Sequence, residues 1–533
     1  MRVPLLSLSL LTGTTLAATY KAHNFSTPID HFHNETRYAP HTNHTFNLRY
    51  WFDADHYEPG GPVFVIAAGE TNGEDRFEFL SNGIVTQLAA TYHGLGVILE
   101  HRYYGESYPF PGDDVSVEDL RFLSTEQSLA DYAYFAQNVV FPGLEEFDLT
   151  APNTPWIAYG GSYAGAQVAF MRKLYPDIFH GAVSSSGVTA AIVDYWKYYE
   201  PIRNYGPVEC IEAIQTLTDI IDRILIDHPE NKTLHSQLKS AFGVESDTDN
   251  KDFVNGLSTP LGTFQSRNWD PAVGSYEFRH YCDNITAPDP VYPVTNGTAS
   301  LPGLLKAAGY NASDTALLAS LRNYIGYMNP PSSSSSTESK DEDEDKNEDE
   351  DEPTGNERLP KSDGTSWNYQ VCTEWGYFMP GSSVPPHIKP LISRLIDLNY
   401  TSSFCNSIYG ISTPPNITLI NQHGGFNFSY PRVAIIGGTA DPWRDATPHA
   451  EGLPGRKSTD AEPFMLIDVP AERVWDGIRG AVHHWDQNGV SSNQTGVEVP
   501  VEIVAAQSEI VRFVGVWLGE DEEETLSGSA EDL

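Results

Sequence analysis

Short apolar runs alternate with helix-like segments along the first 190 residues of the chain. Residues 126–140 have the amphipathic periodicity of a helix that crosses between two strands. Strands that alternate with helices are typical of a mainly parallel α/β sheet. The runs predicted to be buried strands are residues 47–52, 62–67, 94–99, 156–159 and 181–186.

The same alternation returns near the C-terminus, with apolar runs at residues 432–438 and 464–470. Residues 500–518 read as a long amphipathic helix that closes the sheet. The chain between residues 186 and 432 is far longer than two or three βα units, which need roughly 30 residues each. It contains helical patterns, at residues 210–226 and 233–242 among others. We therefore expect a large, mainly helical domain inserted into the sheet domain as a cap.

The run at residues 156–159 leads into Gly-Gly-Ser-Tyr-Ala-Gly at residues 160–165, and a helical segment follows. A strand, a tight turn with a central Ser and a helix together predict a nucleophile elbow, with Ser162 as the nucleophile. Small neighbours fit this strained turn, and the amide N–H of Tyr163 is expected to face a developing oxyanion. A glycine-rich turn that merely contains Ser is the alternative, because G-x-S-x-G patterns also occur by chance.

A serine nucleophile needs a base and an acid that orients it, and in this class of sheet they follow in the order acid, then His. Asp441 comes just after the strand at 432–438, and a loop with His483 and His484 follows the strand at 464–470. An Asp before Pro is often only a turn residue, and a surface His often has no role. Their order along the chain, after two strand ends, nevertheless favours a triad. The second oxyanion donor is expected from the loop after the strand at 62–67, near Gly69 and Glu70.

On these residues the chain resembles the S28 serine peptidases, the group of prolyl carboxypeptidase, dipeptidyl peptidase II and the fungal acid prolyl endopeptidases. The resemblance covers most of the mature chain and implies an α/β-hydrolase fold with an inserted cap. It identifies His483, the first residue of an H-x-x-D group, as the base. The motifs that carry the resemblance are residues 100–105, 124–131, 160–163, 194–196, 372–374, 441–443 and 483–486.

The resemblance also implies peptide hydrolysis after proline through an acyl-enzyme. Trp443 resembles the Trp that walls the family's proline pocket, and Ala166 and Tyr377 match pocket positions where some relatives carry Met. We expect an exopeptidase similar to Pro-Xaa carboxypeptidases, with an endopeptidase as an open alternative. A carboxypeptidase needs a cation for the substrate's carboxylate; an aminopeptidase needs an acid for the amine, for which Glu374 and Glu70 are candidates. A secreted esterase or lipase, and a non-catalytic secreted binding protein, are the alternative functions.

The composition indicates which partners, which medium and which compartment to expect. The 533 residues carry a formal net charge of −40, which argues against nucleic-acid binding and favours an acidic working medium. We expect no membrane span, because no apolar run reaches about 18 residues. We also expect neither cofactor nor metal, and we leave a homodimer open. Residues 1–17 read as a secretory signal, so the protein is expected outside the cell, with a lysosome or vacuole as the alternative.

The expected organisation is sheet domain 18–190, inserted cap 191–363, sheet domain 364–518 and acidic tail 519–533. An acidic, serine-rich stretch within the cap, residues 331–357, is expected to be disordered and dispensable. Four cysteines allow three pairings, and we favour Cys210–Cys282 with Cys372–Cys405, as the resemblance also implies. Eleven N-x-[ST] sequons support secretion: Asn24, Asn34, Asn43, Asn231, Asn284, Asn296, Asn311, Asn399, Asn416, Asn427 and Asn493.

Overall fold

The computed structural model describes residues 19–292, 300–330, 358–490 and 497–519. The predicted signal segment 1–17, the acidic stretch 331–357, nearly all of the tail 519–533 and the sequons at Asn296 and Asn493 lie outside these residues. Among the described residues, no helix is long and apolar enough to cross a membrane.

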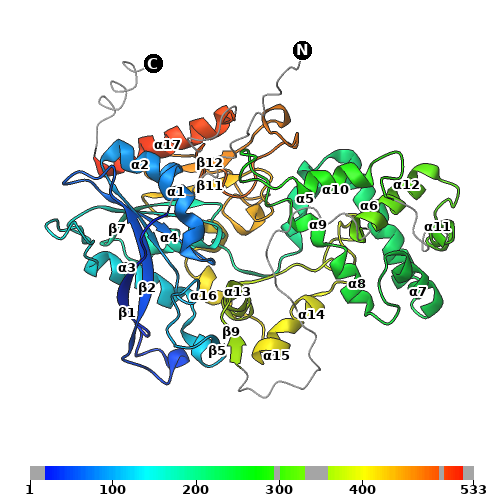
Figure 1. Cartoon of the computed structure of the whole chain (residues 1–533), viewed down its shortest axis with the longest axis horizontal. Coiled ribbons are helices and arrows are strands. Elements are labelled where there is room, and N and C mark those ends of the chain that lie inside the picture. The colour runs from blue at the N-terminus through cyan, green and yellow to red at the C-terminus, as the bar shows by residue number, and fades with distance from the viewer. Residues whose placement is uncertain (1–18, 293–299, 331–357, 491–496, 520–533) are drawn as a thin grey trace, which may run out of the picture.

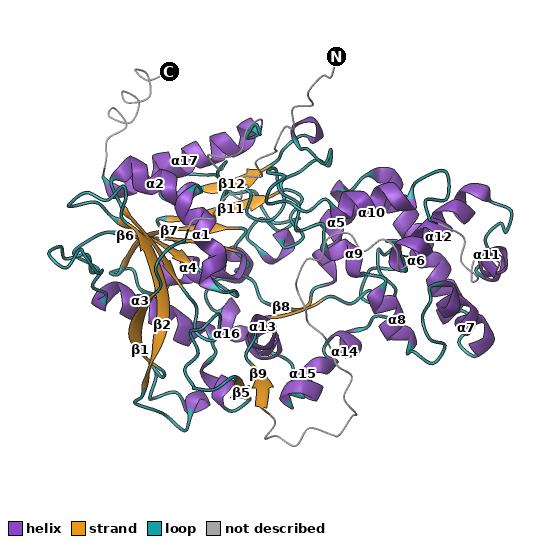
Figure 2. Ribbon diagram, viewed as in Figure 1, coloured by secondary structure: helices purple, strands orange, loops and turns teal. Residues whose placement is uncertain are grey.

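An eight-stranded sheet forms the centre of the larger part of the molecule, as Figure 2 shows in orange. The first three strands in sheet order, β1, β2 and β4, each pair antiparallel with the next. All later neighbouring strands pair parallel. Every residue of β3, β4 and β11 is buried, as expected for parallel strands with both faces covered. In sheet order the strands are β1 (His23–Pro28), β2 (Thr45–Asp53), β4 (Leu95–Leu99), β3 (Val63–Ala67), β6 (Trp156–Gly161), β7 (Phe179–Ser185), β11 (Val433–Gly438) and β12 (Phe464–Ile467).

Two pairs of helices cover the faces of this sheet (Figure 1). On one face α2 (Ile84–Tyr92), next to the short α1 (Phe77–Ser81), packs against α17 (Val501–Leu518), and the Tyr92 hydroxyl donates to the Val511 carbonyl at 2.6 Å. On the other face α3 (Thr125–Asn138) packs against α4 (Ser162–Leu174). A mainly parallel sheet with helices on both faces, and a Ser at the turn after its fifth strand, is the α/β-hydrolase architecture.

The described residues between 200 and 330 form helices and no strand, and they lie beside the sheet, shown in green in Figure 1. The disulfide Cys210–Cys282 joins α6 to α10 within this helical insertion. The sequence therefore predicted its helical character correctly. Its helices are α5 (Glu200–Tyr205), α6 (Val208–Ile226), α7 (Lys232–Ala241), α8 (Asn250–Gly256), α9 (Thr259–Gly262), α10 (Glu277–Ile285), α11 (Leu301–Ala307) and α12 (Thr315–Met328).

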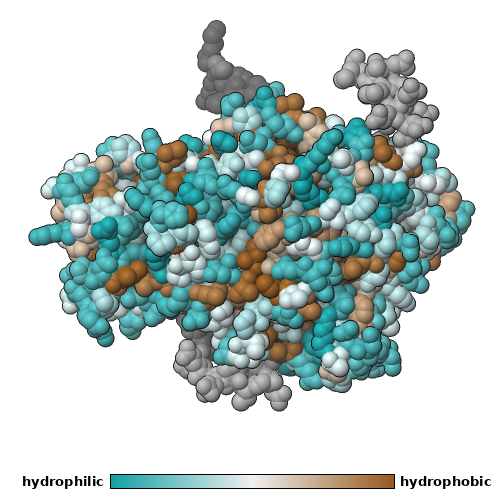
Figure 3. Space-filling model, turned by 180° about the vertical axis from the view of Figure 1, so that it is seen from behind, coloured by the Kyte–Doolittle hydropathy of each residue, from teal (hydrophilic) through white to brown (hydrophobic). Residues whose placement is uncertain are grey.

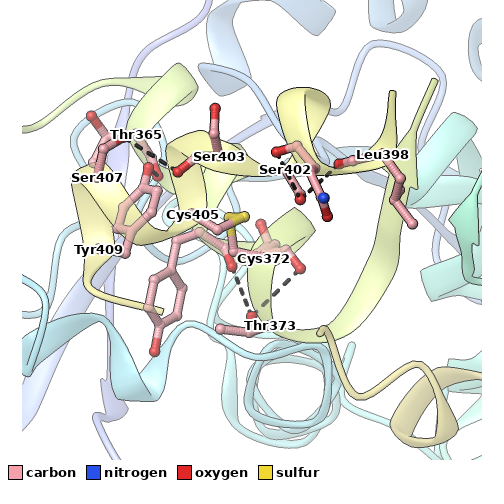
Figure 4. The surroundings of a disulfide bond; sticks show 12 residues. Thr365, Cys372, Thr373, Leu398, Ser402, Ser403, Cys405, Ser407 and Tyr409 are labelled. Atoms are coloured by element: carbon pink, nitrogen blue, oxygen red, sulfur yellow. Dashed lines mark hydrogen bonds between the residues drawn. A yellow bond between two sulfur atoms is a disulfide. The ribbon is translucent and has the colours of Figure 1, made fainter. Parts of the chain in front are cut away.

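Short elements connect the insertion back to the sheet. The strand β8 (Ile192–Asp194) pairs with β10 (Gly376–Phe378), and β5 (Asp114–Ser116) pairs with β9 (Arg358–Pro360). The second disulfide, Cys372–Cys405, fastens α15 to a single π-helical turn (Val371–Trp375) that follows α13 (Figure 4). Tyr409, at the end of α15, donates to the Thr365 carbonyl of α13 at 2.7 Å. The helices here are α13 (Asp363–Gln370), α14 (Leu398–Thr401), α15 (Ser403–Tyr409) and α16 (Thr418–Asn421).

The prediction that the sheet begins at residue 47 was wrong, because β1 precedes it at the edge. Its sequence, His-Asn-Phe-Ser-Thr-Pro, has one residue that is fully buried, Thr27, so hydrophobicity does not reveal it. An edge strand pairs through its backbone on one side alone and needs no continuous apolar run. β12 is also shorter than the predicted run of residues 464–470.

The surface carries mixed polar and apolar residues, and the face seen in Figure 3 gathers apolar side chains near its middle. Asn284 is 6% exposed and its amide donates to the His280 carbonyl at 2.7 Å, so we expect this sequon to stay unmodified. The eight other described sequon residues are exposed: Asn24, Asn34, Asn43, Asn231, Asn311, Asn399, Asn416 and Asn427.

Candidate active site

The turn between β6 and α4 has the geometry of a nucleophile elbow. Ser162 has a φ of 58°, a left-handed conformation that a non-glycine residue rarely adopts. A Cβ atom at Gly160 would lie 2.3 Å from the Ala164 carbonyl oxygen, and one at Gly165 would lie 2.8 Å from the Gly187 Cα. Both positions therefore require glycine, as expected for this turn.

The structure brings Asp441 and His483 together. Nδ1 of His483 lies 3.0 Å from Oδ1 and 2.9 Å from Oδ2 of Asp441, and both side chains are buried. Asp441 is itself held by the Trp443 backbone N–H, which donates to its Oδ1 at 2.9 Å. Because Nδ1 faces a carboxylate it carries the ring proton, which leaves Nε2 of His483 as the basic nitrogen.

The loop that carries His483 is anchored by Asp486, the last residue of the H-x-x-D group. The buried carboxylate of Asp486 accepts hydrogen bonds from the Ser185 hydroxyl at 2.5 Å and the Tyr159 hydroxyl at 2.7 Å. Gln507 of α17 donates to the backbone carbonyl of Asp486 at 3.0 Å. Burial raises the pKa of Asp486. The loop is thus attached to β6, β7 and α17, which positions His483 above the sheet.

His484 packs against the elbow. Its backbone N–H donates to the Ser186 hydroxyl at 3.1 Å. Its ring covers Gly161, where an added Cβ would lie 3.0 Å from the ring. Burial, with the neighbouring His483 and Arg76 adding to the effect, holds the pKa of His484 well below its usual value. His484 is therefore a neutral packing residue, and His483 is the imidazole that meets Asp441.

The residue after Ser162 joins the elbow to α13. The Tyr163 hydroxyl accepts a hydrogen bond from the Gln370 amide at 2.7 Å and donates to Nε2 of His101 at 3.1 Å. His101 in turn donates through Nδ1 to the Arg102 carbonyl at 2.6 Å. Burial lowers the pKa of His101 to about 4, so this ring is neutral. The network fixes the first turn of α4, where backbone N–H groups have no partner within the helix.

The loop after β3 lies against the elbow. Gly69 has a φ of 74°, and a Cβ atom there would lie 3.0 Å from the Ala164 Cβ. In the next residue, Oε2 of Glu70 is buried and accepts no hydrogen bond within the described structure. Burial raises the pKa of Glu70, although the charges of Arg76 and His483 oppose the rise. The charge of Arg76 acts on Glu70 and on His484, and the charge of His483 acts on Glu70, so Glu70 and Arg76 both lie near the loop of residues 483–484.

Aromatic rings surround Trp443, two residues after Asp441. Tyr195 stacks on Trp443 with ring centroids 5.5 Å apart, and Tyr198 and Tyr377 meet it edge-on at 5.5 and 5.0 Å. The Trp443 indole N–H donates to Oε1 of Gln265 at 2.7 Å. Gln265 belongs to the helical insertion, so the insertion contacts this aromatic cluster directly.

Ala166 and Tyr377 lie around the same loop. The Tyr377 hydroxyl donates to the Ala190 carbonyl at 2.9 Å. Ala166, one turn after Ser162 on α4, is fully buried, and its N atom would lie 3.1 Å from a Cβ at Gly187. Loop 187–190 thus connects the elbow helix to the aromatic cluster.

Glu374 lies against the start of α3, and the ring of the next residue, Trp375, meets Tyr163 edge-on with centroids 5.2 Å apart. Its Oε2 accepts hydrogen bonds from the Thr125 N–H at 2.9 Å and hydroxyl at 3.0 Å, and burial raises its pKa. With Lys173 and His423 it lines a cavity of about 510 Å³. Lys173 is near the end of α4 and Ser162 at its start, about 17 Å apart at 1.5 Å per residue. The cavity thus reaches the C-terminal end of α4, and Glu374 stabilises the start of α3 through its two hydrogen bonds to Thr125.

Two sequence motifs outside the triad have structural roles. The Arg102 guanidinium donates to Oδ1 of Asp131 at 2.7 Å in a fully buried ion pair. Glu100 accepts from Arg49 at 2.7 Å. The Arg102–Asp131 pair joins the loop after β4 to α3, and the Glu100–Arg49 pair joins it to β2.

Sequence reasoning missed Arg76 and Gln265. Arg76 lies in a polar segment and Gln265 in the insertion, and neither has a motif around it. Arg76 and Gln265 can be recognised only from their contacts in the folded structure, such as the hydrogen bond between Trp443 and Gln265. Tyr195 and Asp486 were part of the motifs, but their partners became visible only in the structure.

The chain is similar to several known proteins. The family described as serine carboxypeptidase S28 matches residues 27–452. A protein of Arthroderma benhamiae described as a probable extracellular serine carboxypeptidase is 46% identical over 503 residues, which is 94% of this chain and 68% of that protein. The serine protease vicPa of Bipolaris victoriae is 27% identical over 442 residues, 79% of each chain. The human thymus-specific serine protease is 26% identical over 414 residues, 75% of this chain and 73% of that protein.

Proposed function

The chain belongs to the serine carboxypeptidase S28 family, and we propose that it is a secreted carboxypeptidase that cleaves after proline with Ser162, His483 and Asp441. The observation that carries the proposal is the buried Asp441–His483 pair, on a loop whose next residue, His484, packs against Gly161, the residue before the strained Ser162. Asp441 and His483 are 42 positions apart in the chain, so their buried pairing next to the elbow supports a shared role.

In the proposed mechanism, Nε2 of His483 takes the proton from the Ser162 hydroxyl as Oγ attacks the scissile carbonyl. Asp441 keeps the other ring nitrogen protonated and stabilises the imidazolium that forms. The backbone N–H of Tyr163 stabilises the oxyanion, together with the loop at Gly69. His483 then protonates the leaving amine, and water hydrolyses the acyl-enzyme.

The aromatic cluster supports a preference for proline. A proline ring is compact and apolar, and Trp443 with Tyr377 offers aromatic faces of matching character next to Asp441. The hydrogen bond from Trp443 to Gln265 holds the indole in one orientation. Ala166 is smaller than the Met of some relatives, so the pocket should be less strict for proline. We expect it to accept other small residues too, although less well than proline.

We further propose that Arg76 recognises the C-terminal carboxylate of the substrate. Its guanidinium is close enough to the catalytic loop to lower the pKa of His484, and its Nε donates to the Ala68 carbonyl at 3.0 Å. Glu70, with its unpartnered Oε2, would instead suit a substrate amine. The family's carboxypeptidase character favours Arg76.

Secretion and peptide partners fit the remaining observations. The exposed sequons are compatible with glycosylation, and the relative from Arthroderma benhamiae is described as extracellular. The charge of −40 disfavours nucleic acids as partners.

Pro-Phe peptides blocked at one end test this proposal. Wild type should release Phe from an N-blocked peptide with a free carboxylate, and the C-amidated peptide should react poorly. Ser162→Ala should lower kcat by roughly 10⁴-fold or more while the protein still folds. Arg76→Gln should raise KM for the free-acid peptide and leave KM for the amide nearly unchanged. Cleavage of the amidated peptide alone would favour an aminopeptidase, and turnover of aryl esters without peptide cleavage would favour an esterase.

A further inference from the structure

Two exposed histidines and a buried carboxylate meet in the connection between β1 and β2, residues 29–44. Asp30 is 1% exposed, whereas His33 and His41 are on the surface. One potential ligand atom from each of the three residues lies within 4.8 Å of the other two. The two imidazole rings have centroids 5.5 Å apart. The triad and its supporting residues do not include any of these side chains.

The carboxylate of Asp30 is oriented before any ligand arrives. Its Oδ1 accepts hydrogen bonds from the Phe32 backbone N–H and the Gln127 amide, both at 2.9 Å. Its Oδ2 faces Nδ1 of His41 at 2.7 Å. One oxygen is thus fixed to α3 through Gln127, and the other points toward the histidines. Hydrogen bonds of this kind orient the ligands in metal sites.

We propose that Asp30, His33 and His41 bind a divalent transition-metal ion, Zn²⁺ in particular, with water as a further ligand. Imidazole nitrogens with one carboxylate oxygen form a donor set that suits Zn²⁺. Tetrahedral Zn²⁺, with bonds of about 2.0–2.2 Å, needs ligand atoms about 3.4 Å apart. On binding, the ion would replace the hydrogen bond between His41 Nδ1 and Asp30 Oδ2, now 2.7 Å long, with the Nδ1 proton released to solvent. Rotation of the exposed imidazoles would bring the ligand atoms, now within 4.8 Å of one another, to the required spacing.

Such an ion would fasten the β1–β2 connection to α3. His33 and His41 lie on either side of the short 3₁₀ turn Thr36–Tyr38, and Asp30 is attached to Gln127. An ion that binds the folded chain and not the unfolded chain stabilises the folded state by mass action. Zinc should therefore raise the melting temperature in a concentration-dependent way. The proposed site has no role in peptide hydrolysis.

The test uses the secreted full-length protein after treatment with a chelator. Isothermal titration with ZnCl₂ should show one site per chain, and zinc should raise the melting temperature. His33→Ala and His41→Ala should each weaken zinc binding at least about tenfold and reduce the thermal shift, with peptide turnover before zinc is added unchanged. His44→Ala is the matched control, because His44 is an exposed histidine of the same connection. None of the three substitutions removes the sequons at Asn34 or Asn43.

Two results would overturn the proposal. One is the absence of stoichiometric zinc binding by wild type. The other is undiminished binding by both alanine variants, which would place the zinc elsewhere. If His41→Ala lowers the melting temperature without zinc, His41→Gln separates the effects, since its amide can still donate to Asp30. Co²⁺ supplies a direct readout: tetrahedral coordination gives visible absorption in wild type, which His41→Gln should lack.

Discussion

Asp486 provides a test of how the catalytic loop is held in place. It is the buried acceptor for the hydroxyls of Ser185 and Tyr159, at 2.5 and 2.7 Å. Asp486→Ala leaves both hydroxyls without this acceptor. A buried polar group that loses its partner costs about 1–3 kcal/mol, so the two together cost about 2–6 kcal/mol. Domains are typically stable by about 5–15 kcal/mol, so the variant should fold with a clearly lower melting temperature.

The same change should reduce catalysis, because His483 is three residues away on the same loop. A displacement of a catalytic group by about 1 Å costs about 10²-fold in rate. We expect Asp486→Ala to lower kcat by about that factor, with a smaller effect on KM. Asp486→Asn should keep stability within about 1 kcal/mol. Its amide offers one acceptor and one donor, and burial already raises the pKa of Asp486 and so favours the neutral acid.

Thermal melts and steady-state kinetics on a proline peptide provide the readouts. Asp468→Ala is the matched control: Asp468 also accepts a hydroxyl hydrogen bond, from Thr439 at 2.8 Å, but its side chain is 51% exposed. This control should change stability by no more than about 1 kcal/mol. If Asp486→Ala melted and turned over like the control, the anchoring role of Asp486 would be refuted.

Three further predictions concern other parts of the site. His483→Ala should abolish turnover, whereas His484→Ala should retain a substantial fraction in the same kinetic assay; the reverse result would move the base by one position. Gly69→Ala should lower kcat by about 10²-fold with a smaller effect on KM, because the new Cβ at a φ of 74° would press on Ala164 and shift the oxyanion loop; unchanged kcat would separate this loop from the oxyanion hole. The pKa of His101 is about 4 in the folded protein against 6.5 in the unfolded chain, so this ring should contribute a loss of about 3 kcal/mol of stability as the pH falls from 6.5 to 4. Denaturant unfolding of His101→Phe across that range should show a correspondingly weaker acid loss, and parallel curves for the two proteins would contradict the burial of a neutral ring.

Local patterns predicted much of the fold because the parallel strands are continuous apolar runs with both faces covered. The runs at β3, β4, β6 and β11 were recognisable for this reason. β1 was not, since an edge strand of polar residues takes its stability from pairing with β2. Short helices such as α14 and α16, each one turn long, have too little periodicity to recognise.

The candidate site also contains residues that the sequence predicts and residues that it does not place. Ser162, Asp441 and the pair His483 and His484 could be proposed as candidates from the sequence, because each follows a recognisable strand and the order of a triad is restricted, and the resemblance favoured His483. The elbow glycines were predictable too, since the steric demands of the turn are local. The sequence alone does not place Glu374, a candidate acid for a substrate amine, whose carboxylate accepts hydrogen bonds from Thr125 in the structure.

The sequence by itself determined most of the sheet's buried strands, the candidate nucleophile and the order of its candidate partners, because backbone periodicity and turn sterics act over a few residues. Only the tertiary structure decided which histidine meets Asp441, that Asp486 binds Ser185 and Tyr159, and that Gln265 of the insertion reaches Trp443. These contacts join segments tens to hundreds of residues apart. Their geometry depends on how the whole chain packs, and no local pattern records it.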